Sequence, residues 1–357
     1  MSNQVAPAGE AGLEPGELTG LRRAFVGRLR RPTLTQALGL VVIVAAGLVP
    51  VFTDDQYLLD VLTEAGLFVL LGLGLNIVVS LAGLLDLGYI AFWAVGAYTA
   101  AMLASPQFHL ATPFLLLAPI AVLVTSVFAV IIGVPTLRVR GDYLAIVTLG
   151  FGEIVRLSLL NGGSNITGGW SGIQAISRPS LFGYSFGYEL QPYYYLIYVV
   201  CVAALVAGHR LRTSKIGVIW QALRDNELAA GASGVRPLTY YLLAFGLGAG
   251  FGGISGLLFA TKQIAVSPDT FTVDQSFLVL AIVVLGGLSG RFWPVAISAV
   301  LVISLPELLR GFQEYRLVVF GPLLVLFIMV RERWPDISRY FGKRMRALPA
   351  IGNPGSR

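Results

Sequence analysis

Long apolar segments separated by short polar stretches make up most of this chain. Apolar runs of about 20 residues have the length at which an α-helix crosses the hydrocarbon core of a bilayer. The pattern therefore predicts an all-α, polytopic integral membrane protein with about ten transmembrane helices, some of them broken or short. The predicted spans are 34–52, 58–80, 87–104, 113–134, 143–160, 193–209, 239–260, 276–288, 293–309 and 316–330.

Basic residues between the predicted spans indicate the topology. They cluster before the first span and after the fourth, the sixth and the last, at Arg22, Arg23, Arg28, Arg30, Arg31, Arg138, Arg140, Arg210, Arg212, Lys215, Arg224, Arg236, Arg331, Arg333, Arg339, Lys343, Arg344 and Arg346. With ten crossings all these clusters and both termini lie in the cytoplasm, as the positive-inside rule requires, whereas nine would place the last cluster outside. Residues 1–31 and 333–357 are then basic cytoplasmic tails, the first without a packed domain, and 32–332 is the membrane domain.

Composition supports a membrane protein and excludes several other classes. The chain is 56% hydrophobic and only 12% charged, and its net charge of +6 is explained by topology rather than by nucleic-acid binding. The single cysteine, Cys201, forms no disulfide framework, and His109 and His209 have no partners at ligand spacing, so no metal site is predicted. No convergent catalytic set and no phosphate-binding G-x-x-x-x-G-K-[ST] motif occurs, so we expect neither an enzyme nor a bound nucleotide cofactor.

A mixed polar stretch, Ser214 to Pro237, interrupts the apolar pattern near the middle of the chain. It is too polar to cross a bilayer, and it lies within a predicted cytoplasmic loop, 210–238. Trp220, Leu223, Glu227 and Ala230 recur at helical spacing. The stretch therefore predicts a short cytoplasmic helix between two membrane halves. On the other side of the membrane, 161–192 is predicted to be a long external loop.

A glycine-rich run lies inside the predicted span 239–260. It comprises Gly246, Gly248, Gly250, Gly252, Gly253 and Gly256. Gly248, Gly250 and Gly253 match G-x-G-x-x-G, but a dinucleotide site needs a strand before that motif and a helix opening at it. The same glycines form G-x-x-x-G pairs, which let helix backbones approach closely in lipid. We therefore predict a helix-packing role.

Four polar residues are candidates for the transport pathway. Asn76 is expected inside the membrane, and Asp86 at a short turn or a break in a helix. Buried polar groups at such depth face a cavity or a partner helix, and the sequence leaves both possibilities open. Glu153 and Arg156 stand three residues apart, so they either neutralise each other on one helix face or border the pathway near its outer side.

Four stretches, in order, resemble one known family. They are LNIVVSLAGLLDLGYIAFWAVGAYTAAML (75–103), RVRGDYLAIVTLGFGEIVRLSLLN (138–161) with TGG (167–169), ALRDNELAAGASGV (222–235) and LAIVVLGGLSGRFWPVAISAVLVISLPELLR (280–310). This order is similar to that of the LivM-type permeases of branched-chain amino-acid ABC importers. The similarity covers about residues 55 to 332 and leaves out both tails. The bulky Arg291-Phe292-Trp293-Pro294 departs from the small, glycine-rich turn expected there.

The resemblance implies a function and a set of partners. The chain would be a permease subunit that imports Leu, Ile or Val by alternating access across the bacterial cytoplasmic (inner) membrane. It would assemble with an unlike, LivH-type permease, with two ATP-binding subunits that hold ATP and Mg, and with an extracytoplasmic substrate-binding protein. The family-like positions in the central loop are Arg224, Asp225, Glu227, Ala229, Ala230 and Gly234, and the resemblance implies that they couple the membrane domain to the ATPases.

Two other functions remain open from the sequence. Related permeases carry urea or short amides, and the departure at 291–294 bears on that choice if this turn faces the pathway. An ion-coupled secondary carrier would instead need acidic residues buried in several spans, and the sequence offers mainly Glu153.

Overall fold

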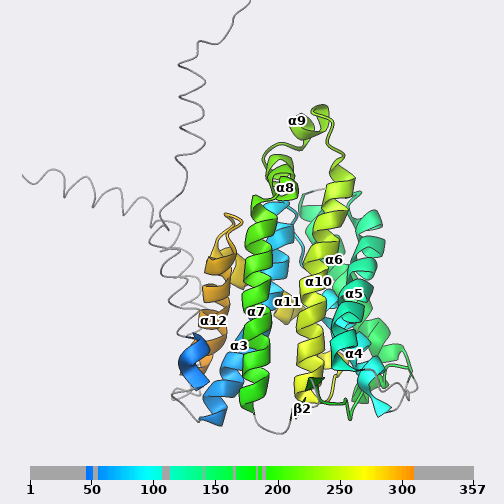
Figure 1. Cartoon of the computed structure of the whole chain (residues 1–357). Coiled ribbons are helices and arrows are strands. Elements are labelled where there is room, and N and C mark those ends of the chain that lie inside the picture. The colour runs from blue at the N-terminus through cyan, green and yellow to red at the C-terminus, as the bar shows by residue number, and fades with distance from the viewer. Residues whose placement is uncertain are drawn as a thin grey trace, which may run out of the picture.

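The computed structural model describes residues 46–50, 55–106, 113–139, 141–163, 166–181, 184–186 and 190–308. These residues form a bundle of long helices that run between its two ends (Figure 1). The long helices are α3 (Gln56–Asn76), α4 (Ile90–Ala104), α5 (Phe114–Thr136), α6 (Asp142–Asn161), α7 (Leu190–Thr213), α10 (Pro237–Gln263), α11 (Val273–Gly286) and α12 (Phe292–Leu308). The short helices α8 (Lys215–Asp225) and α9 (Glu227–Ala232) connect α7 to α10.

Eight of the ten predicted spans fall on these helices. Within the described part of the chain, six segments are long and apolar enough to cross a membrane, whereas α4 and α12 are shorter. The predicted span 276–288 corresponds to α11, which ends at Gly286, and the next residue, Gly287, has a φ of 93°. The predicted span 34–52 is described only at 46–50, and 316–330 and both tails lie outside the described residues. The count of ten therefore stays a prediction.

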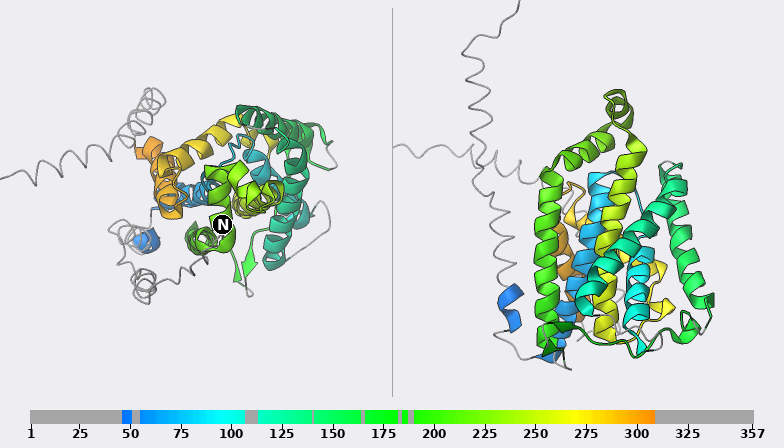
Figure 2. Two further views of the ribbon diagram at one scale, coloured as in Figure 1. Left: turned by 90° about the horizontal axis from the view of Figure 1, so that it is seen from above. Right: turned by 45° about the vertical axis from the view of Figure 1, so that its right-hand side comes forward.

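The α3 and α10 helices form the centre of the bundle. Most of α3 is buried against α7, α10, α11 and α12, and α10 packs against α3, α4 and α5. Seen along the bundle axis, α5 and α6 lie on one side and α12 on the other (Figure 2). The α5 and α6 helices expose large apolar side chains such as Leu123, Ile131 and Ile146. In a membrane protein such a flank lies against lipid or against another membrane subunit.

The α10 glycines lie where neighbouring backbones come close. A Cβ atom on Gly256 would lie 2.3 Å from the Trp93 carbonyl oxygen of α4, and one on Gly248 would lie 2.9 Å from the Gly74 oxygen of α3. An added Cβ atom on Gly253 would likewise lie 2.7 Å from Thr125 Oγ1 of α5, whereas Gly246, Gly250 and Gly252 have more room, with nearest atoms at 3.4, 3.2 and 3.3 Å. Small residues thus permit α10 to occupy the centre.

The α-helical conformation is interrupted between α3 and α4. A π-helical turn, η1 (Ile77–Leu81), ends α3, and Gly83 then takes a φ of 77°, which favours glycine. Residues 82–88 contain no regular helix, and α4 begins at Ile90 rather than at the predicted residue 87. At 15 residues, α4 is about 22 Å long, which is less than a full crossing.

The connection between α6 and α7 covers the end of the bundle opposite α8 and α9 (Figure 1). It contains the short helix η3 (Gly169–Ser171) and a hairpin of β1 (Ser180–Leu181) and β2 (Tyr184–Ser185), which is the exception to the all-α prediction. Ile173 pairs with Val266, which follows α10, through hydrogen bonds of 2.9 and 3.0 Å. The 3₁₀ turn η4 (Pro268–Thr270) comes directly after that pairing.

Candidate functional site

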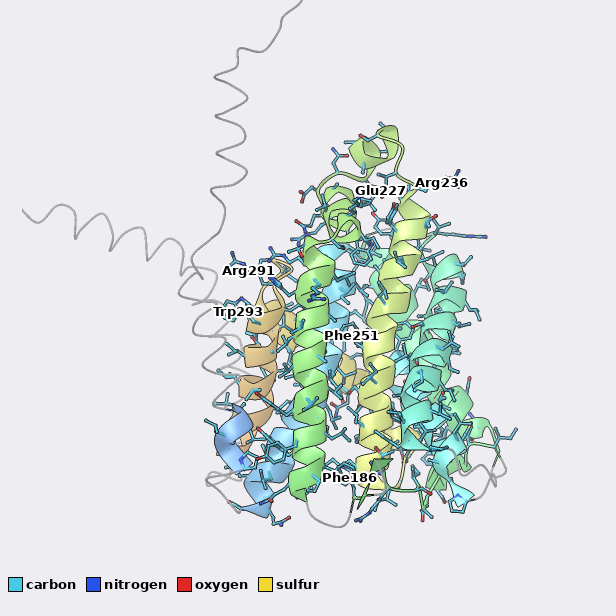
Figure 3. The ribbon with its side chains drawn as sticks, viewed as in Figure 1. Phe186, Glu227, Arg236, Phe251, Arg291 and Trp293 are labelled. Atoms are coloured by element: carbon cyan, nitrogen blue, oxygen red, sulfur yellow. The ribbon has the colours of Figure 1, made fainter. Side chains whose placement is uncertain are left out.

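The stretch 214–236, which contains α8 and α9, projects from one end of the bundle. Figure 3 shows Glu227 and Arg236 at this end and Phe186 at the other. The prediction of one continuous helix here was wrong, because Asn226 has an extended backbone with a φ of −158° and separates α8 from α9. The Asn226 side chain accepts a hydrogen bond from the Ala229 N–H at 3.0 Å and so caps α9. Asparagine favours such caps over helix interiors.

One face of these two helices is buried against the bundle. Trp220, Leu223 and Ala230, which the sequence placed on one face, are all buried, and Glu227 is half-buried. The Trp220 indole N–H donates a hydrogen bond of 2.7 Å to the carbonyl oxygen of Tyr240 in the first turn of α10. Trp220 therefore holds α8 against the start of the central helix.

The opposite face points to solvent. Leu228 is 80% exposed, and Ala229 and Gly234 are also exposed. Gly231 and Gly234 have open space where a side chain would lie. Sequence reasoning named the small residues but missed Leu228, although a leucine beside Ala-Ala-Gly-Ala in a polar stretch was the available signal. This tip is a small apolar surface surrounded by residues that permit close approach.

Arg224 and Asp225, at the end of α8, point in a different direction from that tip. The Arg224 guanidinium donates hydrogen bonds to the carbonyl oxygens of Ser80 in η1 and of Leu288, the latter at 2.6 Å. Asp225 is exposed and lines a polar cleft together with Glu227. The six family-like positions thus divide between the bundle side of the segment and its solvent side.

The polar cleft has a volume of about 690 Å³ and lies between α8–α9 and the bundle. Its walls are the 82–85 break, the α5–α6 connection, the α8–α9 junction and the first turn of α10. Both signs of charge face it, from Arg138, Asp142, Arg224, Asp225 and Glu227. The cleft separates part of α8–α9 from the bundle.

Asn76 and Asp86 lie deep in the bundle, on either side of η1. The Asn76 side-chain amide donates to the Arg291 carbonyl oxygen at 3.4 Å, and Asp86 lies in the non-helical break, as predicted. One Asp86 oxygen accepts a hydrogen bond of 2.9 Å from the Gly88 N–H. The Asn76 Oδ1 and Asp86 Oδ2 atoms are buried without a hydrogen-bond partner among the described residues. Both residues therefore retain unused polar capacity inside the bundle.

Glu153 and Arg156 pair with each other on α6, as their spacing predicts. The closest contact, from Arg156 Nη2 to Glu153 Oε1, is 2.6 Å, and the Arg156 guanidinium also lies 3.6 Å from Asp269 of η4. Both side chains are partly exposed. The sequence did not indicate a second ion pair, from Lys262 of α10 to Asp60 of α3 at 2.7 Å. Neither ion pair includes Asn76 or Asp86.

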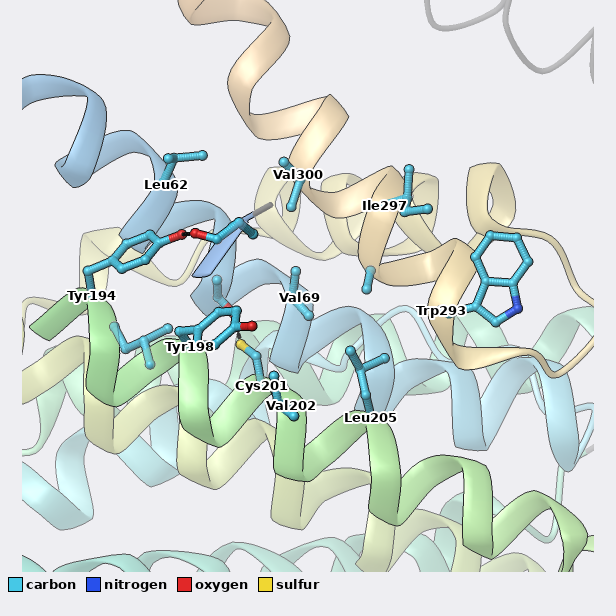
Figure 4. A pocket seen from close by; sticks show the side chains of 14 residues that line it. Leu62, Val69, Tyr194, Tyr198, Cys201, Val202, Leu205, Trp293, Ile297 and Val300 are labelled. Carbon is cyan, nitrogen blue, oxygen red and sulfur yellow. Dashed lines mark hydrogen bonds between the residues drawn. The ribbon is translucent and has the colours of Figure 1, made fainter. Parts of the chain in front are cut away.

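An apolar pocket of about 110 Å³ lies on the flank of the bundle, between α3, α7 and α12 (Figure 4). Leu62, Tyr198, Cys201 and Val300 are among its walls, and Trp293 closes one end. Phe292 is buried against Gly208 of α7. The bulky turn at 291–294 thus contributes its aromatic side chains to packing against α7 and to this flank pocket.

Comparison with known proteins decides the family. The model of the family described as branched-chain amino acid transport system / permease component matches residues 57–328. This chain belongs to that family of transport permeases. Two relatives named high-affinity branched-chain amino acid transport system permease protein LivM, from Salmonella typhimurium and Escherichia coli, are each 40% identical to it over 323 residues. The match covers 84% of this chain and 75% of each relative.

More distant relatives of this permease include a ribose import permease protein, RbsC, from Haemophilus influenzae. It is 23% identical over 320 residues, which cover 87% of this chain and 88% of the relative. No solved structure matches the chain significantly. The described helices and the family together establish a membrane protein.

Proposed function

We propose that this permease is the transmembrane subunit of an ATP-driven importer of the branched-chain amino acids Leu, Ile and Val. The observation that carries the proposal is the 40% identity, over 84% of the chain, to two permeases named for branched-chain amino acid transport. The ribose permease is more distant, at 23% identity. The bulky 291–294 turn packs on the flank, so it gives no reason to prefer urea or short amides.

In this proposal the energy comes from separate subunits. Two ATPases bind ATP and Mg, and one of them docks against the solvent face of α8–α9, where Leu228, Ala229 and Gly234 are exposed. An unlike permease completes the pathway, and a substrate-binding protein docks at the opposite end. The α8–α9 end and both termini face the cytoplasm, and the protein lies in the bacterial inner membrane. The mechanism is alternating access, driven through α8–α9.

The pathway residues belong to the proposal as well. Asn76, at the end of α3, and Asp86, in the non-helical break after η1, each keep one buried oxygen without a hydrogen-bond partner among the described residues. Breaks of this kind form substrate sites in other transporters. Glu153 and Arg156 are the weaker candidates, because they neutralise each other.

The test combines assembly with uptake. We would tag the chain, extract it gently from native membranes and identify the proteins that copurify with it. The same membranes would be used to prepare vesicles for uptake of labelled Leu, Ile and Val. We expect an unlike permease and two ATPases in the complex, and uptake that requires ATP and binding protein. Uptake of urea, short amides or ribose in preference to Leu would contradict the substrate.

The same assay separates the importer from an ion-coupled carrier. A carrier would copurify alone, and its uptake would collapse with an ionophore while ATP depletion at constant ion gradient left it unchanged. The structure offers a carrier little support, because Glu153 is ion-paired and Asp86 is the buried acid among the described residues. Copurification of the chain alone, together with uptake that depends on the ion gradient and not on ATP, would overturn the proposed function as a whole.

A further inference from the structure

Arg224 occupies an unusual position between two helix ends. Its guanidinium donates to the carbonyl oxygens of Ser80, in the last turn of α3–η1, and of Leu288, two residues after α11 ends. The last carbonyl groups of a helix have no partner within that helix and carry the negative end of its dipole. One cation therefore joins a carbonyl group in the last turn of α3–η1 to a carbonyl group in the α11–α12 turn, two residues after α11 ends.

The backbone around this contact is shaped to fit the arginine. Gly83 has a φ of 77°, and an added Cβ atom there would lie 2.8 Å from Arg224 Cγ. Gly290 has a φ of 67°, and an added Cβ atom there would lie 2.6 Å from Leu81 Cδ2. The stem of Arg224 thus lies directly on one turn, while the second turn packs against η1. Side chains at either glycine would push these parts apart.

The α11–α12 turn is also held from inside the bundle. Asn76 donates to the Arg291 carbonyl oxygen at 3.4 Å, on the same turn that Arg224 contacts through Leu288. This turn is therefore hydrogen-bonded to α3 through Asn76 and to α8 through Arg224. Of these two hydrogen bonds, only the one from Arg224 would change if α8–α9 moved relative to the bundle, because Asn76 belongs to α3 itself.

We propose that Arg224 is a positioning residue that transmits movement of α8–α9 to the C-terminal ends of α3–η1 and α11. It acts from the bundle side of the segment, while Leu228 on the solvent side meets the ATPase. The inference rests on the proposed function and adds that α8–α9 contacts the ATPase and the bundle through different residues. When the ATPases move α8–α9, the two helix ends move with it because Arg224 joins them.

The central test separates assembly from coupling. In the purified full complex, reconstituted in vesicles with binding protein, we expect Arg224→Gln to keep both ATPases bound and to keep ATP hydrolysis within about twofold of wild type. Uptake per ATP hydrolysed should fall by about tenfold or more, because charge-assisted hydrogen bonds are lost. Arg224→Lys should lie in between, since it keeps the positive charge, but both hydrogen bonds come from the one guanidinium nitrogen Nη1, whose position a lysine ammonium group on its different stem does not reproduce.

A second variant tests the same contact without removing the arginine. Gly83→Ala places a methyl group against Arg224 Cγ and should reproduce the low ratio of uptake to hydrolysis. Gly141→Ala is the matched control, because Gly141 also has a positive φ of 64° but has open space at its Cβ position. It also places a side chain at a positive φ at the same end of the bundle, without touching Arg224.

Two further variants complete the set. Arg236→Gln removes one exposed positive charge from the same end and should leave uptake and hydrolysis unchanged. Leu228→Ser should instead reduce the amount of copurifying ATPase several-fold. If Arg224→Gln and Gly83→Ala import as well as their controls, or if Arg224→Gln releases the ATPases as Leu228→Ser does, the inference is wrong. Failure of the wild-type complex to assemble or import would instead reject the proposed function.

Discussion

Single residues in α8–α9 have separate tasks although they are close in sequence. Trp220 is fully buried and anchors α8 to α10, Arg224 reaches two helix ends, and Leu228 faces solvent. Helical geometry explains this, because residues four apart share a face only while the helix continues. The break at Asn226 turns the second helix, so Leu228 does not follow the direction that a continuous helix from Arg224 would give it.

Trp220 gives a prediction about stability at this scale. Trp220→Ala should lower the free energy of unfolding by about 3–5 kcal/mol, because it removes a fully buried aromatic ring. Trp220→Phe keeps most of the ring and loses the hydrogen bond to the Tyr240 carbonyl, so about 1–2 kcal/mol is expected. Thermal unfolding in detergent would measure both variants. Equal midpoints for Trp220→Ala and wild type would contradict the anchoring role.

At the scale of elements, α10 can lie at the centre of the bundle because many of its residues are glycines, which have no side chain. Its glycines leave room for the backbones of α3 and α4, and Ser126 of α5 donates a hydrogen bond of 2.8 Å to the Gly246 carbonyl oxygen. In lipid the hydrophobic effect does not drive helices together, so close van der Waals contact and hydrogen bonds between helices do. The glycine pattern therefore indicates that α10 packs closely against its neighbouring helices.

Two alanine variants in α10 test that packing. Gly256→Ala should destabilise the protein by about 1–3 kcal/mol or more, because its methyl group would overlap the α4 backbone at Trp93 and Ala97. Gly246→Ala should be nearly neutral, since its nearest neighbour would lie at 3.4 Å and alanine favours a helix. Thermal unfolding in detergent compares them directly. A neutral Gly256→Ala would show that α4 and α10 are less closely packed than described.

At the scale of the whole molecule, the two ends of the bundle differ in character. One end has α8–α9 and the polar cleft, and the other has the α6–α7 connection, where Trp170 is 71% exposed. The proposed topology places the first end in the cytoplasm and the second outside. Since the chain contains one cysteine, Cys201, which is buried, introduced cysteines can report on each end separately.

We expect Leu228→Cys to react with a membrane-impermeant thiol reagent only from the cytoplasmic side, in vesicles of known orientation without partner subunits. Trp170→Cys should react only from the opposite side, because Trp170 lies in η3, near Ile173, which pairs with Val266 just after the end of α10. Leu123→Cys, on the exposed apolar flank of α5, should react with a lipophilic reagent and not with the water-soluble one. Labelling of Leu228→Cys and Trp170→Cys from the same side would contradict the topology.

The sequence by itself determined the class of protein and most of its helices. Apolar runs of bilayer length predict spans because every backbone polar group must be satisfied within lipid, and this constraint is visible residue by residue. The pairing of Glu153 with Arg156 and the end of α11 at Gly286-Gly287 were likewise local consequences of spacing and of glycine. Four ordered motifs indicated the family, which the match over 57–328 then confirmed.

Only the tertiary structure decided which way the coupling residues point and what they touch. The carbonyl oxygens that Arg224 meets belong to Ser80 and Leu288, which are 144 and 64 residues away, and carbonyl groups leave no signature in a sequence. The pair of Lys262 and Asp60 was equally invisible, because its partners come from two helices that adjoin only after packing. Contacts of this kind depend on the arrangement of whole elements, which local spacing does not specify.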